Sequence, residues 1–197
     1  MMLFNRSISM IRVSARWLWP LGISVAIALL FSLRAPILAG AGGAPSSPPQ
    51  DGPTSLIPSQ SRKPAPDLNL TDIAGAKVSL ASYRGKVVLL DFWAVDCGGC
   101  VKEIPWYVEF DHKYHEKGLQ PLGIDMYDEP PSKIKPFMEK AHMQYPVAVG
   151  NDEIRNRFQA DELPKTMLID RQGRVAVSHV GIVDKATFER DIEELLK

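Results

Sequence analysis

The stretch that decides the fold is Val87-Val88-Leu89-Leu90-Asp91-Phe92-Trp93-Ala94-Val95-Asp96-Cys97-Gly98-Gly99-Cys100. Its first part is a near-continuous apolar run, typical of a central strand that is covered on both faces. The run leads into the only two cysteines of the chain, which are separated by two glycines. If a helix starts there, its first-turn amides stabilise the thiolate of the first cysteine. The pattern indicates a redox pair, because a structural bridge more often joins distant segments.

Charge is unevenly distributed along the 197 residues. The 23 basic and 23 acidic side chains balance over the whole chain. Residues 1–62 carry five of the basic groups and one of the acids, so residues 63–197 have a net charge of −4. An acidic body without a basic stripe argues against nucleic acid as the main partner.

The N-terminal segment, residues 1–39, has the pattern of a targeting sequence. Arg6, Arg12 and Arg16 precede an apolar stretch over residues 17–33, and no acid occurs before Asp51. Positive charges before an apolar segment keep the N-terminus in the cytoplasm and send the following chain outward. Small residues at 39–41 offer a cleavage site. A cleaved signal peptide and an uncleaved membrane anchor both fit this length.

Residues 40–62 are rich in Gly, Pro and Ser and are predicted to form a tether between the targeting segment and a folded domain at 63–197. Within the domain, strands alternate with helices. Strands are expected at 77–80, 87–92, 121–125, 147–149, 166–170 and 174–180, and helices at 97–117, from the Ser132 cap to 142, at 153–158 and at 187–197. Gly173 is placed for the positive φ of a tight turn. Such an order implies an α/β fold whose sheet is covered on both faces.

Several motifs together resemble one family. They are Ala65-Pro66-Asp67-Leu68, Tyr83-Arg84-Gly85-Lys86-Val87-Val88-Leu89, the cysteine pair with its preceding Asp91-Phe92-Trp93-Ala94, Glu103-Ile104-Pro105, Tyr145-Pro146-Val147, Leu163-Pro164-Lys165-Thr166-Met167-Leu168-Ile169-Asp170, and His179-Val180-Gly181. In this order they resemble the thioredoxin fold and, more narrowly, the membrane-tethered extracytoplasmic thiol–disulfide oxidoreductases of the TlpA/ResA type. The resemblance covers the whole domain and implies a central mixed β-sheet flanked by helices.

The resemblance also implies roles for individual residues. Cys97 matches the exposed attacking cysteine, and Cys100 matches the more buried resolving cysteine. Pro164 matches the proline that is cis in this fold and faces the disulfide. Glu103 matches an acid near the pair, and Asp91 occupies the position of the buried acid of thioredoxins.

The two acids have alternative interpretations. Asp91 lies on an apolar strand, so burial should raise its pKa towards the range in which it relays the proton of a thiol. It could also be a buried acid that is satisfied at the strand end. Glu103, three residues after Cys100, fits a second relay group or a solvated surface acid.

Two charged residues depart from the family pattern and are candidates for tuning the thiolate. Asp96 stands where an aromatic residue usually precedes the first cysteine, and its charge would raise the pKa of Cys97. Lys165 stands where a threonine commonly follows the cis-proline and would oppose that effect. We therefore expect Asp96 and Lys165 to interact, although two independent solvated charges fit equally well.

The predicted function is thiol–disulfide exchange with client proteins outside the cytoplasm. The resemblance implies reduction of client disulfides, as in cytochrome c maturation, and a membrane electron donor. The chemistry needs no cofactor and no metal, since zinc takes about four ligands and no Cys/His cluster occurs. One alternative is a non-enzymatic module that holds a thiol client or copper. Another is a peroxiredoxin, but Ala94 stands where the threonine of those enzymes would be.

Overall fold

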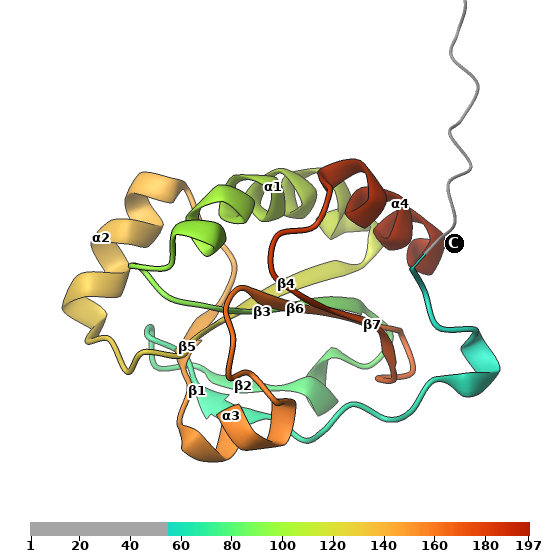
Figure 1. The fold of residues 1–197 in the computed structure, drawn as a ribbon, viewed down its shortest axis with the longest axis horizontal. Helices are drawn as coiled ribbons and strands as arrows, with labels where there is room; N and C mark the ends of the chain where they lie inside the picture. Colours follow the sequence, from blue (N-terminus) through green and yellow to red (C-terminus); the bar gives the residue numbers. More distant parts are fainter. Residues whose placement is uncertain (1–54) are drawn as a thin grey trace, which may run out of the picture. The chain divides into compact units, whose positions relative to one another are not determined.

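The computed structural model describes residues 55–197. A five-stranded sheet has the strand order β5-β4-β3-β6-β7, and β1 and β2 form a separate antiparallel pair (Figure 1). The elements in chain order are η1 (Ser59–Ser61), β1 (Asn69–Thr71), β2 (Lys77–Ser79), η2 (Leu80–Tyr83), β3 (Val87–Trp93), α1 (Gly98–Tyr114), η3 (His115–Lys117), β4 (Leu119–Asp125), α2 (Pro131–Ala141), β5 (Val147–Val149), α3 (Asp152–Phe158), β6 (Lys165–Ile169), β7 (Val175–Val180) and α4 (Lys185–Leu196).

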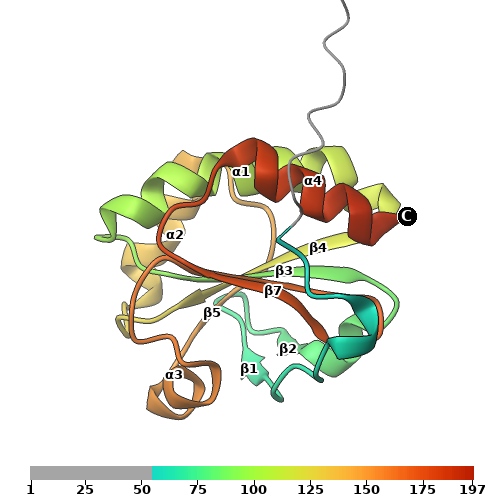
Figure 2. The ribbon, with the colours of Figure 1, turned by 45° about the vertical axis from the view of Figure 1, so that its right-hand side comes forward.

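Helices cover the two faces of the five-stranded sheet unequally. Helices α1, α2 and α4 lie on one face, while α3 and the β1/β2 pair lie on the other (Figures 1 and 2). The core is divided in the same way, with Phe110 and Phe188 in one buried cluster and Leu68 and Phe158 in the second. The sheet is mixed, because β3 pairs parallel to β4 and antiparallel to β6. The predicted α/β architecture is confirmed.

Strand β3 lies at the centre of the sheet, and each of its residues is buried. Side chains alternate between the two faces of a strand. Leu89 and Trp93 accordingly pack in the cluster below α1, and Leu90 and Phe92 pack in the cluster above α3. Asp91, between them, therefore shares the α1 face with Leu89 and Trp93. This periodicity places an acid in the layer that also contains the first turns of α1.

Most predicted elements agree with the structure to within a few residues, and the turn at Gly173 has a φ of 73° as expected. The start of α2 differs from the prediction. The helix begins at Pro131, and its N-cap is Pro130 without a side-chain cap, so Ser132 is not the capping residue. A proline in the first turn needs no cap for a missing N–H and has its φ preset for the helix.

The N-terminal end of the described chain differs from the predicted tether. Residues 55–62 run against β7, where the Ile57 N–H donates to the Ala176 carbonyl at 2.8 Å. Arg62 forms an ion pair with Asp170 at 3.2 Å. The predicted signal or anchor at 1–39 and the predicted tether residues 40–54 lie outside the described residues. Within residues 55–197, none of the helices is both long and apolar enough to span a bilayer.

Candidate redox site

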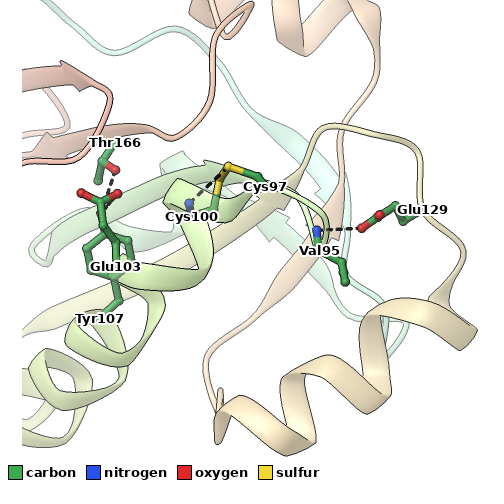
Figure 3. Close-up of a disulfide and its surroundings, with 7 residues drawn as sticks. All are labelled: Val95, Cys97, Cys100, Glu103, Tyr107, Glu129 and Thr166. Carbon is green, nitrogen blue, oxygen red and sulfur yellow. Dashed lines mark hydrogen bonds between the residues drawn. A yellow bond between two sulfur atoms is a disulfide. The ribbon is translucent and has the colours of Figure 1, made fainter.

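The two cysteines form a disulfide at the start of α1. The S–S distance is 2.01 Å and the two Cα atoms are 5.3 Å apart. Cys97 is the N-cap of α1, and its Sγ accepts a hydrogen bond from the Cys100 N–H at 3.2 Å (Figure 3). Cys97 is partly exposed, whereas Cys100 is 1% exposed. The more exposed cysteine is thus also the one whose sulfur accepts a hydrogen bond from a helix amide.

Pro164 lies against this first turn of α1. The Leu163–Pro164 peptide bond is cis, which confirms the prediction from the resemblance. A Cβ built on Gly99 would be 2.9 Å from Pro164 Cδ and 3.5 Å from Ile182 Cγ1, whereas one built on Gly98 meets nothing within 4 Å. The close approach of the proline ring therefore explains the glycine at position 99 but not the glycine at position 98.

Asp91 is a buried acid without a hydrogen-bond partner among the described residues. Its side chain is 1% exposed, and neither carboxyl oxygen is paired. Burial raises its pKa well above the usual 3.8, and the nearby Glu103 carboxylate raises it further. The alternative of a satisfied buried acid does not hold, because neither oxygen has a protein donor.

Glu103 is buried as well, at 3% exposure, so it is not a solvated surface acid. Its Oε1 accepts from the Val183 N–H at 3.0 Å, and its Oε2 accepts from the Tyr107 hydroxyl at 3.1 Å. Tyr107 Oη also lies 2.9 Å from Thr166 Oγ1 (Figure 3). Burial raises the pKa of Glu103 from 4.5, although the two hydrogen bonds oppose the shift.

Comparison with known proteins agrees with this geometry. A model of the AhpC/TSA family matches residues 62–178. The chain belongs to the AhpC/TSA family. Among its relatives, the thiol-disulfide oxidoreductase ResA of Geobacillus kaustophilus is 33% identical over 132 residues, which cover 66% of this chain and 75% of the relative. ResA of Bacillus thuringiensis is 34% identical over 134 residues, covering 68% of this chain and 77% of the relative.

A solved structure supports the same assignment. The thiol:disulfide interchange protein of the thioredoxin family from Chlorobium tepidum superposes with a TM-score of 0.63 at 28% identity, covering 69% of this chain and 97% of that one. Together with the ResA relatives, it shows that this AhpC/TSA-family chain is a thioredoxin-like protein-disulfide oxidoreductase.

The expected interaction between Asp96 and Lys165 is wrong, because the two side chains have different partners. Asp96 forms an ion pair with Lys133 at 2.6 Å. Lys165 is 6% exposed and donates to the Gln159 carbonyl at 2.9 Å, at the end of α3. The reason is strand alternation: Pro164 faces α1, so the next residue in the strand points to the other face of the sheet. Burial lowers the pKa of Lys165.

Sequence reasoning missed several residues of the site. Tyr107 lies four residues after Glu103 in α1, a spacing that puts both on one helix face, and this signal was available in the sequence. Glu129 and Lys133 have the same spacing but lie far from the cysteines in sequence. Glu129 accepts a hydrogen bond from the Val95 N–H, and Lys133 pairs with Asp96; these contacts could not be predicted from a pattern. Across residues 55–197, no group of three or more His, Cys, Asp or Glu side chains is arranged to hold a metal ion.

Proposed function

We propose that this oxidoreductase reduces disulfides in client proteins outside the cytoplasm, as the TlpA/ResA resemblance implies, with cytochrome c maturation as the process it serves. Residues 1–39 would direct it there as a membrane anchor or a cleaved signal. One observation carries the proposal. A partly exposed Cys97 caps α1 above a buried Cys100, in a layer that also contains two buried acids with raised pKa values.

In the first step, the Cys97 thiolate of the reduced protein attacks one sulfur of a client disulfide. The new Cys97–client S–S bond forms as the client S–S bond breaks, and the second client sulfur leaves as a thiolate. The Cys100 N–H, 3.2 Å from Cys97 Sγ in the oxidised form, stabilises the thiolate before the attack.

In the second step, Cys100 attacks Cys97 Sγ and releases the client as a dithiol. Cys100 is buried, so its proton must leave through a neighbouring group. The Glu103 and Asp91 carboxyls have raised pKa values, and a base works best when its pKa lies near the operating pH. Two electrons pass to the client, and the Cys97–Cys100 disulfide remains. A membrane-bound dithiol donor would reduce it again.

The proposed function can be tested by trapping the mixed disulfide between Cys97 and a client protein. Without the resolving thiol the mixed disulfide persists, so the Cys100→Ser variant should form a covalent adduct with a client protein that dithiothreitol releases. Cys97→Ser is the matched control and should form none. An adduct with Cys97→Ser and none with Cys100→Ser would reverse the assigned roles.

The direction of electron flow needs a second measurement. If this protein reduces its clients, its reduction potential should lie near that of thioredoxin, about −270 mV, when it is equilibrated with glutathione buffers. A value near the roughly −120 mV of a strong oxidant such as DsbA would contradict a reducing role.

A further inference from the structure

A further buried carboxylate, that of Glu129, lies on the opposite side of the disulfide from Glu103 (Figure 3). Glu129, between β4 and α2, is 6% exposed. Its Oε2 accepts a hydrogen bond from the Val95 N–H at 3.0 Å. Val95 lies two residues before Cys97 in the link between β3 and α1. A side chain from another segment therefore holds the backbone that carries the partly exposed cysteine.

Glu129 is itself held through both its carboxylate and its backbone N–H. Lys133, in the first turn of α2, donates to Glu129 Oε1 at 2.6 Å. The Glu129 N–H donates to Oδ1 of Asp125 at 2.9 Å, and Asp125 is fully buried at the end of β4. Burial acts to raise the pKa of Glu129, but hydrogen bonds with Lys133, the Val95 N–H and Asp125, together with the charge of Lys133, lower it overall. Glu129 is therefore a charged, immobilised acceptor at neutral pH.

The segment that Glu129 holds has few other restraints. The Cys97 N–H donates to the Ala94 carbonyl at 3.2 Å, and Lys133 reaches Asp96 at 2.6 Å. Val95 and Asp96 belong to neither β3 nor α1. Hydrogen bonds weaken steeply as their angles deteriorate, so a small rotation of this link would misalign Cys97 Sγ with the amide of Cys100.

We propose that Glu129 is a positioning residue for thiol–disulfide exchange: by holding the Val95 peptide, it keeps Cys97 Sγ over the first-turn amides of α1. Glu129 exchanges no bond or proton in the reaction and acts through the backbone. This inference rests on the proposed role of Cys97 as the nucleophile.

Two conservative variants separate position from charge. Glu129→Gln keeps the length and an acceptor oxygen for the Val95 N–H but removes the charge. Glu129→Asp keeps the charge but is one methylene too short to reach Val95. Glu139→Asp is the matched control, because Glu139 is an exposed acid on α2. In each reduced protein, the rate of Cys97 alkylation by iodoacetamide is measured against pH, which gives the Cys97 pKa.

If Glu129 acts by positioning the backbone, the reactivity of Cys97 should be impaired in Glu129→Asp. Its Cys97 pKa should rise by about one unit and its alkylation rate at pH 7 should fall about tenfold, the effect of losing one hydrogen bond to a charged group. Glu129→Gln and Glu139→Asp should stay within about twofold of the wild type. Amide hydrogen exchange at Val95 should accelerate in Glu129→Asp and remain slow in Glu129→Gln, which a general loss of stability would not produce.

Three results would overturn the inference. Impairment of Glu129→Gln alone would assign the effect to charge, equal impairment of both variants would assign it to the fold, and no impairment would remove Glu129 from the reaction. A separate result concerns the proposed function. If Cys97 of the wild-type protein is not the faster-alkylated cysteine, the nucleophile assignment fails whatever the variants do.

Discussion

The two sides of the disulfide each contain a buried glutamate, and the two glutamates have opposite electrostatic settings. Glu103 accepts its hydrogen bonds from neutral groups, the Val183 N–H and the Tyr107 hydroxyl, and its pKa is raised. Glu129 accepts from the Lys133 ammonium, and its pKa is lowered. The difference teaches that the partner, more than burial, decides what a buried carboxylate can do. The Glu103 side can take up a proton, and the Glu129 side stays a fixed anion.

The largest effect is expected when Glu103, the residue on the proton-accepting side of the disulfide, is replaced. Glu103→Gln cannot accept a proton, so turnover of a disulfide substrate at pH 7 should fall about 100-fold, at the low end of general acid–base contributions. Wild-type turnover should decline as the pH falls through the raised pKa of Glu103, and the variant should lack this decline. The control is Glu116→Gln, an exposed acid beyond the end of α1. Equal turnover by both variants would remove Glu103 from the reaction.

The next effect tests how tightly the Glu103 side is packed. Gly99→Ala places a Cβ 2.9 Å from Pro164 Cδ and 3.5 Å from Ile182, whose neighbour Val183 binds Glu103. Overpacking of this kind destabilises by about 1–3 kcal/mol. Gly98→Ala, in open space, should be neutral or slightly stabilising. Denaturant unfolding of both variants measures the difference, and equal stability would contradict the packing shown here.

A stability measurement across pH separates Asp91 from the paired acids. Its folded pKa is raised above the unfolded value, so the contribution of Asp91 to stability is most favourable at low pH, where Asp91 is protonated in both states. Stability is lost as the pH rises from about 4, where the unfolded chain begins to ionise, through the folded pKa. Asp91→Asn should lack this loss and be more stable at pH 8 by about 1–3 kcal/mol. A parallel pH profile for the two proteins would contradict the buried, unpaired setting of Asp91.

The smallest effect is expected at Lys165. Because its amino group lies on the α3 face at the Gln159 carbonyl, Lys165→Thr should leave the Cys97 pKa unchanged within about 0.2 unit, far below the one-unit shift of a lost charge-assisted hydrogen bond. Asp96→Asn is the contrasting variant, because it removes the charge directly before Cys97 and should lower the Cys97 pKa. A shift of the thiolate titration in Lys165→Thr would revive the rejected interaction.

The sequence was sufficient for features that depend on local pattern. The apolar run of β3, the cysteine pair at a helix start and the burial of Asp91 all follow from periodicity along single elements. Strand alternation also puts Lys165 on the opposite face of the sheet from Pro164. The expected Asp96–Lys165 pair did not take this alternation into account. Glu129 could not be found in this way, because its contact with Val95 joins segments 34 residues apart. The burial of Glu103 likewise depends on the loop that brings Val183 over α1.

The contact of residues 55–65 with β7 has a consequence for how copies of this protein meet one another. Strand β7 is at one edge of the sheet, and exposed edges recruit strands from other molecules. Here the Ile57 and Ala65 N–H groups and the Lys63 carbonyl pair with Ala176, Gly173 and Val175 along that edge. The segment thus acts as a cover against self-association. A truncated chain that begins at residue 66 would expose these backbone groups of β7 and offer the strand as a template for aggregation.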